Sequence, residues 1–246
     1  MPLKEELEKH GEWLFKRRSY LPLLILPVIL VTLKHSEDLE RLLWEAADDL
    51  WKGFCVCLSF LGLIIRCVTV GYVPEGTSGR NTKRQKAKFL NTNGMYSIVR
   101  HPIYLGNFFI MLGMTLFVEV WWFTLFSVLA FWLYYERIII AEEEFLQRKF
   151  GGLYLEWAEK TPAFLPKLRK WQRPSVSFSF RAVLAREYTT FFVITTYFAF
   201  IDITEDAFIE NKLDLAWLIV FATGFILYLM LRTLKKKTRI LYVKGR

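Results

Sequence analysis

The stretch NGMYSIVRHPIYLGNFF spans residues 93–109. Its centre places Arg100, His101 and Pro102 directly before an apolar run. Proline suits the first position of a helix, where its missing backbone N–H is not needed. The sequence therefore predicts a helix that begins at Pro102 and enters a membrane, with Arg100 and His101 at its N-terminus. Free N–H groups and the helix dipole make that end attractive to anions, although an Arg there can also serve membrane topology alone.

The composition is typical of a multi-span membrane protein. Of the 246 residues, 54% are hydrophobic, and the mean hydropathy is +0.26, which is too apolar for an ordinary soluble domain. The net charge of +9 is compatible with nucleic-acid binding, but Lys and Arg also collect in the cytoplasmic loops of membrane proteins. Because the basic residues are spread over three loops and not over one aromatic-rich face, we exclude nucleic acid as a partner.

Six apolar runs predict an all-α, polytopic membrane protein with about six transmembrane helices. The runs lie at about 20–33, 51–73, 103–119, 121–140, 189–203 and 213–231. The first and the fifth are short for a bilayer that needs roughly 20 residues, so either could be re-entrant. The connecting segments alternate between basic and acidic, which places both termini in the cytoplasm by the positive-inside bias. Removing one short span would break this alternation.

The second apolar run carries Arg66 in its interior and holds all three cysteines. Arg66 lies about seven residues from the inner end of the run, roughly 10 Å at the rise of a helix. A mid-membrane Arg costs on the order of 3 kcal/mol unless it snorkels or pairs. Snorkelling and a contact with a lipid head group are therefore the two interpretations of Arg66. Cys55, Cys57 and Cys67 have no partner at metal-ligand spacing, and we expect no metal site.

A cluster of acidic residues follows the fourth apolar run. The positive-inside bias does not favour Glu142, Glu143 and Glu144 at this position, so a partner must hold them there. Arg100 or Arg137 is one candidate partner. A ligand with hydroxyl or amine donors is another, since carboxylates bind ribose in dinucleotide sites. A solvated helix start is the plain alternative.

Two linked motifs give the most specific signal in the chain. The pattern G-x-Y-x-x-x-R-H-P-x-Y-x-G runs from Gly94 to Gly106. It is followed by E-E-x-x-L-x-x-x-F-G-x-x-Y from Glu142 and by T-P-x-F-x-P from Thr161. Together these motifs resemble the integral-membrane methyltransferases of the isoprenylcysteine carboxyl methyltransferase and phospholipid methyltransferase group. The resemblance covers about residues 80–168.

The resemblance implies a pocket for S-adenosylmethionine on the cytosolic side, between the inner ends of the third and fourth spans. The cofactor-binding residues that it implies are Asn81, Lys88, Phe89, Leu90, Asn91, Tyr96, His101, Pro102, Ile103, Tyr104, Glu142 and Glu143. Arg100 and His101 are the predicted catalytic residues, and we expect His101 to position the cofactor and not to abstract a proton. In the prenylcysteine enzymes an Arg before the acidic pair binds the acceptor's anion, and Arg137 stands one residue from that place.

The chain departs from the prenylcysteine pattern in two ways. It has a basic insert at residues 74–93, and it adds two spans after the core. Arg80 and Arg84 in this insert, together with Arg66 and Arg137, are the predicted acceptor-binding residues, since Arg binds phosphate bidentately. The loop and the adjoining motif look similar to bacterial lipid-phosphate methyltransferases, including those that act on lipid A.

These observations predict an S-adenosylmethionine-dependent O-methyltransferase of an anionic membrane lipid, located in a bacterial inner membrane. Residues 1–73 would form two spans, 74–168 the methyltransferase core, and 169–246 two further spans with a basic tail. An ionised phosphate or carboxylate needs no general base, which suits a sequence with three histidines. An isoprenylcysteine carboxyl methyltransferase and a non-enzymatic lipid-binding or transport protein of the same fold are the alternatives. The sequence leaves the oligomeric state open.

Overall fold

The computed structural model describes residues 3–18, 45–74, 76–77, 87–205, 215–243 and 245. Within these residues the chain is helical, and its extended pairing is a single isolated bridge between Gly94 and Gln172. The all-α fold class predicted from the sequence is confirmed.

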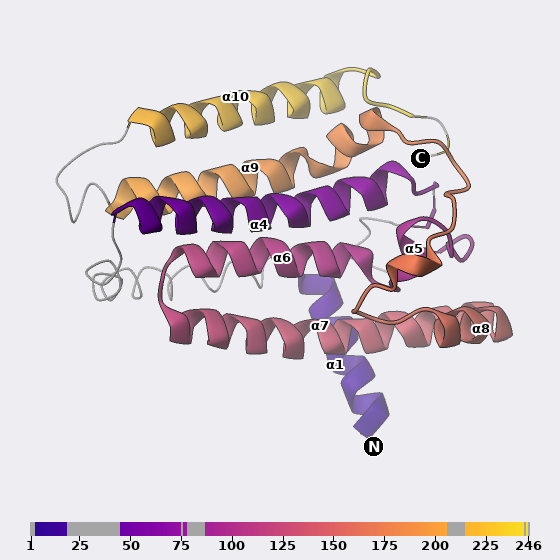
Figure 1. Ribbon diagram of the computed structural model, residues 1–246. Coiled ribbons are helices and arrows are strands. Elements are labelled where there is room, and N and C mark those ends of the chain that lie inside the picture. Colours follow the sequence, from indigo (N-terminus) through magenta and orange to yellow (C-terminus); the bar gives the residue numbers. More distant parts are fainter. Residues whose placement is uncertain are drawn as a thin grey trace.

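Five long helices form a stack in which each helix packs on the next (Figure 1). In spatial order they are α10 (Leu215–Lys237), α9 (Phe180–Glu205), α4 (Glu45–Gly71), α6 (Pro102–Phe117) and α7 (Trp121–Phe150). A core of buried apolar side chains joins four of them, with Phe117 of α6 against Phe198 of α9 at its centre. The stack therefore places α6, which begins with the R-H-P motif, between α4 and α7.

Three of the described helices are long and apolar enough to cross a membrane: Asp49–Gly71, Trp121–Phe150 and Leu215–Lys237. Helix α6 is apolar but shorter, with 16 residues. Helix α9 has 26 residues, about 39 Å at the rise of a helix, but it carries charged residues among its apolar ones. The predicted first span, 20–33, lies outside the described residues. The fold is that of an all-α membrane protein, and the count of six spans stays a prediction.

Helix α7 extends ten residues beyond the apolar run that predicted it, to Phe150. The extra residues are mostly Glu, Leu, Gln, Arg and Lys, which favour a helix. Glu142, Glu143 and Glu144 therefore lie inside a continuous helix. The alternative that they form a solvated helix start is wrong.

Helices α4 and α6 approach each other closely because glycines line their contact. A Cβ on Gly106 would lie 2.6 Å from Cγ of Arg66 and 2.7 Å from the carbonyl oxygen of Gly62. Either distance is too short for a real side chain, so the last glycine of the first motif is needed for helix packing. The same close approach lays the aliphatic stem of Arg66 across α6.

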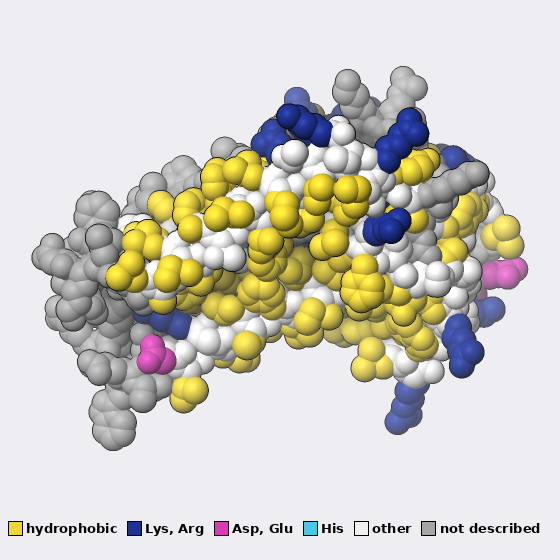
Figure 2. All heavy atoms as spheres, turned by 90° about the horizontal axis from the view of Figure 1, so that it is seen from above, with side chains coloured by type: hydrophobic (Ala, Val, Ile, Leu, Met, Phe, Trp, Pro, Cys, Tyr) yellow, Lys and Arg dark blue, Asp and Glu magenta, His cyan; other side chains and the backbone are white. Residues whose placement is uncertain are grey.

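The shorter helices gather at the end of the stack where α6 begins and α7 ends (Figure 1). They are α5 (Met95–Ile98), α8 (Gly152–Lys160) and the 3-10 helix η3 (Leu168–Lys170). Helix α1 (Leu3–Arg17) instead crosses α7 and packs against it. Figure 2 shows hydrophobic side chains along most of the visible described surface, with most Lys and Arg toward the end that holds α5 and α8. This distribution suits a membrane-embedded stack with one basic interface.

Candidate active site

The acidic pair on α7 faces the turn that starts α6. Arg100 donates from Nη1 to Oε2 of Glu143 at 3.0 Å, and Nε2 of His101 lies 2.9 Å from Oε1 of the same carboxylate. Arg100 is thus the partner expected for the acidic cluster. A single carboxylate holds both polar side chains of the R-H-P motif, which fixes the entrance of α6 against α7.

The second carboxylate, Glu142, has a different set of neighbours. Tyr104 donates its hydroxyl to Oε1 of Glu142 at 2.6 Å. Arg18 of the N-terminal segment lies 3.7 Å from the same oxygen, and Nδ1 of His101 lies 3.8 Å from Oε2. The rings of His101 and Tyr104 are stacked with centroids 5.7 Å apart, because the two residues follow one another by about one helical turn. His101 is therefore buried between two carboxylates.

The chain after α8 runs back along α5 and fixes the motif loop. The backbone N–H of Arg100 donates to the carbonyl of Pro162 at 2.9 Å, and that of Lys167 donates to the carbonyl of Ile98 at 3.0 Å. The segment that carries the T-P-x-F-x-P motif therefore fixes the position of the R-H-P turn through backbone hydrogen bonds.

Two motif glycines are explained by backbone conformation. Gly94, with φ of 61°, and Gly151, with φ of 54°, both adopt positive φ, which disfavours other side chains. Gly94 also donates its N–H to the carbonyl of Gln172 at 3.1 Å. Gly151 separates α7 from α8 and so ends the helix that carries the acidic pair.

Two tyrosines outside the long helices complete the cluster as neutral groups. Burial raises the pKa of the Tyr96 phenol, and the charge of Glu142 raises it further. Burial and the charge of Glu143 likewise raise the pKa of Tyr154, whose hydroxyl lies beside that carboxylate. Both phenols therefore keep their protons at physiological pH.

A second polar network lies deeper in the stack, around Arg66. Its guanidinium donates to both carboxylate oxygens of Glu187 on α9, from Nε at 2.8 Å and from Nη2 at 3.1 Å. It also donates to the hydroxyl of Thr190 at 3.3 Å and to the side-chain oxygen of Asn107. The side-chain amide nitrogen of Asn107 in turn donates to the hydroxyl of Tyr135 at 2.8 Å. The charge of Arg66 is thus balanced by pairing, and the snorkelling interpretation is not needed.

The structure brings together most of the predicted cofactor residues. Tyr96, Arg100, His101, Tyr104, Glu142 and Glu143 form the cluster, and Pro102 and Ile103 lie in the same turn of α6. The segment Lys88, Phe89, Leu90 and Asn91 precedes α5 as an irregular loop. Lys88 and Phe89 are exposed there. The Lys88 N–H donates to the carbonyl of Gly76 at 2.9 Å, and Oδ1 of Asn91 accepts from the N–H of Asn93 at 3.3 Å.

Of the four predicted acceptor-binding arginines, the structure describes Arg66 and Arg137, and it does not bring these two together with the acidic pair. Asn81, Arg80 and Arg84 lie outside the described residues. Arg66 is committed to Glu187, and Arg137 donates to the carbonyl of Leu133 at 2.9 Å. Arg137 is five residues before Glu142. At about 100° per residue, its side chain leaves α7 about 140° around the helix axis from that of Glu142. Contacts of these residues with an acceptor stay a prediction.

Sequence reasoning missed two charged residues of these networks, Arg18 and Glu187. Arg18 stands in a basic run at residues 16–18, which membrane topology alone suffices to explain. Glu187 lies 121 residues from Arg66, so no local spacing links them. Arg66 itself was the available signal, because an acidic partner elsewhere in the chain is one of the ways to stabilise a membrane-embedded Arg.

This geometry defines an all-α membrane protein with a buried His–carboxylate–Tyr cluster at one end of its helix stack. Residues 55–152 match the family model described as "Phospholipid methyltransferase". The match confirms the resemblance to the phospholipid methyltransferase and isoprenylcysteine methyltransferase group that the two motifs carry.

Curated relatives match between a third and about half of the chain. The cobalt-zinc-cadmium resistance protein CzcN of Cupriavidus metallidurans is 37% identical over 129 residues, which is 52% of this chain and 57% of that protein. The nickel-cobalt-cadmium resistance protein NccN of Alcaligenes xylosoxydans xylosoxydans is 32% identical over 129 residues, 52% of this chain and 58% of that protein. The protein-S-isoprenylcysteine O-methyltransferase of Schizosaccharomyces pombe is 35% identical over 85 residues, 35% of this chain and 36% of that enzyme.

The chain thus spans less than two thirds of the length of each of these relatives. No solved structure matches it significantly. The segment matched by the family model includes most of α4 and all of α6 and α7, and with them the R-H-P motif and the acidic pair. Helices α1, α9 and α10 lie outside the matched segment.

Proposed function

We propose that this protein transfers a methyl group from S-adenosylmethionine to an anionic oxygen of a membrane-embedded lipid, with a lipid phosphate of the lipid A type as the acceptor. The observation that carries the proposal is the meeting of Glu142 and Glu143 with the R-H-P-x-Y turn of α6. The same two motifs define the resemblance to membrane methyltransferases. The proposed site lies at the basic, cytosolic end of the stack.

The residues present fit the cofactor. Two carboxylates can accept hydrogen bonds from its ribose hydroxyls and amine, and their charge favours a sulfonium nearby. The stacked rings of His101 and Tyr104 offer aromatic faces, which also attract a cation. Glu142, Tyr104 and Tyr96 would hold the adenosine part, and His101 would orient the methyl-bearing end.

The chemistry needs alignment more than proton transfer. When bound, the cofactor supplies an electrophilic methyl group: the acceptor oxygen gives the electron pair of the new ester bond, and the methyl–sulfur bond breaks with its electron pair left on the sulfur of S-adenosylhomocysteine. No proton leaves the acceptor, so His101 needs no free lone pair and can stay bound to Glu143. The task of the residues is to hold the reactants in line and to exclude water, which the burial of His101 and the packed aromatic side chains favour.

The acceptor assignment rests on charge and on the departure from the prenylcysteine pattern. The basic insert and the basic end of the stack suit an anionic head group. An isoprenylcysteine carboxylate is the second candidate, favoured by the relatives named as protein-S-isoprenylcysteine O-methyltransferases. A lipid-binding or transport protein of the same fold is the non-enzymatic alternative.

The experiment is a transfer assay with purified protein and S-adenosylmethionine that carries a heavy-isotope methyl group. One set of vesicles contains lipid A, another a phosphate-free lipid, and a third a farnesylcysteine analogue. We expect labelled lipid A, heavier than its precursor by about 14 Da plus the isotope increment. Label only in the farnesylcysteine would select the second candidate. Absence of label in all three, with the cofactor bound, would reject methyl transfer to these acceptors.

The names of two relatives suggest a cellular consequence of the same reaction. Methylation of a phosphate or carboxylate removes one negative charge from the membrane surface. Because divalent cations bind such anions, we expect cells that lack the gene to become more sensitive to cadmium and cobalt. If cells with and without the gene are equally sensitive to these metals, the protein does not share the metal-resistance role that the names of those relatives give.

A further inference from the structure

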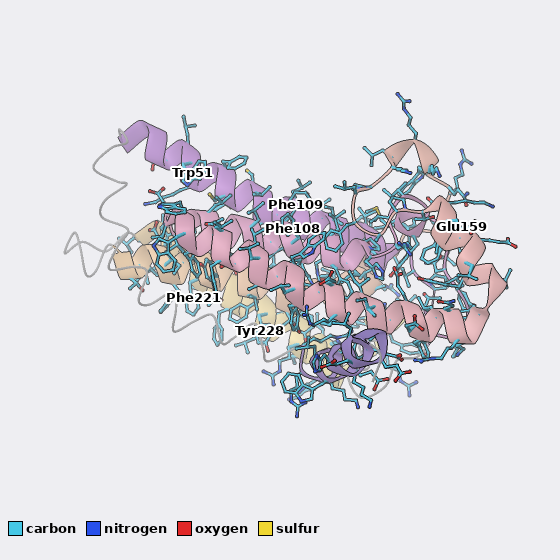
Figure 3. The ribbon with its side chains drawn as sticks, turned by 90° about the horizontal axis from the view of Figure 1, so that it is seen from below. Trp51, Phe108, Phe109, Glu159, Phe221 and Tyr228 are labelled. Carbon is cyan, nitrogen blue, oxygen red and sulfur yellow. The ribbon has the colours of Figure 1, made fainter. Side chains whose placement is uncertain are left out.

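The N-terminal helix α1 is docked onto the helix that carries the acidic pair. A Cβ on Gly11 would collide with the carbonyl oxygen of Arg137, so the two backbones touch. Phe15, one turn later, is buried against Tyr104 and Ile138. Figure 3 shows α1 lying against the part of α7 that leads toward α8, where Glu159 is labelled. The end of α1 therefore has a fixed place beside the cluster.

That end positions Arg18 at the site. Its guanidinium carbon lies 4.0 Å from the centroid of the Phe15 ring, which supports the planar group from one side. Its Nη1 lies 3.7 Å from Oε1 of Glu142, the oxygen that accepts the hydrogen bond of Tyr104. The side chain is 23% exposed, so it is held in place and still reachable.

Three arginines have described ion pairs in the two networks, and they differ in how tightly they are held. Arg66 donates twice to Glu187, at 2.8 and 3.1 Å, and Arg100 donates to Glu143 at 3.0 Å. The pair of Arg18 with Glu142, at 3.7 Å, is longer than a hydrogen bond. Turning Arg18 toward another anion therefore disturbs less than turning either of the others, and Glu142 keeps its bond from Tyr104.

We propose that Arg18 binds the anionic group of the acceptor lipid, as a specificity residue supplied by a helix outside the family-matched segment. The inference rests on the methyl transfer proposed above. A guanidinium presents parallel N–H donors that match two oxygens of a phosphate or a carboxylate. Arg18 stands two residues before the predicted first span, where a lipid head group meets the interface. Arg137 lies on another side of α7 from the acidic pair. Arg18 is therefore the residue to which we assign the acceptor anion that Arg137 was expected to bind.

The test replaces Arg18 in the full chain and compares it with its neighbour. Arg17 has its guanidinium 4.2 Å from the centroid of the Trp13 ring and serves as the matched control. Arg18→Gln should raise the KM for lipid A in vesicles by about tenfold or more, the effect expected when a charged substrate contact is lost. Arg18→Lys should recover part of this loss. Arg17→Gln should leave the KM unchanged, and the Kd for S-adenosylhomocysteine, measured by calorimetry, should stay within about twofold for all three variants.

A second variant moves Arg18 without changing it. Gly11→Leu forces α1 off α7 and should raise the acceptor KM as Arg18→Gln does, while the cofactor product still binds. Wild-type kinetics in both Arg18→Gln and Gly11→Leu would overturn the role of Arg18. A weakened Kd for the cofactor product with an unchanged acceptor KM would also overturn it, because Arg18 would then serve the cofactor. A wild-type protein that binds the cofactor product but methylates no lipid would reject the proposed function and this inference with it.

Discussion

At the scale of single residues, the two adjacent glutamates have separate tasks. Glu143 neutralises Arg100 and lies within hydrogen-bond distance of His101, whereas Glu142 accepts from Tyr104 and faces Arg18. Adjacent helical positions point about 100° apart, so the pair can reach into two sides of one cluster. The proposed site therefore depends on each carboxylate in a different way.

The Glu143 position should be essential for turnover. Glu143→Gln removes the charge that balances Arg100 and weakens the contact with His101, and we expect turnover to fall by at least about 100-fold, as for a lost charged contact in a buried site. His101→Ala should have an effect of similar size. Circular dichroism should show the helical content of both variants unchanged. Glu144→Gln, one position further along α7, is the control and should retain activity; equal loss in all three variants would contradict the assignment.

The Tyr104 hydroxyl should matter for cofactor affinity more than for folding. Tyr104→Phe keeps the ring that stacks on His101 and removes only the donor to Glu142. A hydrogen bond to a charged group contributes about 1.5–3 kcal/mol, which corresponds to roughly a 10- to 100-fold weaker Kd. Calorimetry with S-adenosylhomocysteine measures this directly. A Kd equal to that of the wild type would show that Glu142 does not bind the cofactor through this arrangement.

At the scale of helices, one buried ion pair connects the matched segment to the part of the chain beyond it. Arg66 on α4 and Glu187 on α9 lie within the stack, with side chains 15% and 5% exposed. The close contact of Gly106 with Arg66 brings α6 to the same point, and Asn107 extends the network to α7 through Tyr135. Four helices are thus fixed by a single guanidinium.

Breaking this pair from one side should destabilise the protein. Glu187→Ala leaves Arg66 buried without its carboxylate, and such a loss costs about 3–5 kcal/mol. The double variant Arg66→Met, Glu187→Leu removes both charges and should recover most of that stability, since apolar replacements of buried pairs are often near neutral. Thermal unfolding in detergent compares the three proteins. A double variant as unstable as Glu187→Ala would show that packing, and not the unpaired charge, causes the loss.

At the scale of the whole molecule, the sequence predicted the fold class and the central residues of the cluster. It did not predict the residues from distant helices, Arg18 and Glu187, that contact the cluster and the neighbouring network. Local signals sufficed for α6, because Pro102 marks its start, and for the acidic pair, because three Glu follow an apolar run. Arg18 and Glu187 escaped because their partners lie far away in the chain, and ordinary topology explained a basic residue before a span. Arg137 was placed by its distance along the sequence, whereas its angle around α7 decides which way it faces.

The outermost helix should be dispensable for cofactor binding. In the stack α10 packs on α9, and only 6% of the apolar window of α10 is buried inside the protein. The cluster and the Arg66–Glu187 pair lie on the other side of α9 or beyond it. A chain that ends after Glu205 should therefore bind S-adenosylhomocysteine with a Kd within about threefold of the wild type.

A chain that ends before Phe180 provides the contrasting truncation. It loses Glu187 as well, so Arg66 remains unpaired and the site should lose its cofactor affinity and its thermal stability together. The Arg66→Met substitution in that shorter chain removes the stranded charge and should restore part of the stability. If both truncations bind the cofactor product equally well, the Arg66–Glu187 pair does not support the site. If both fail, α10 contributes to the site through contacts beyond its packing on α9.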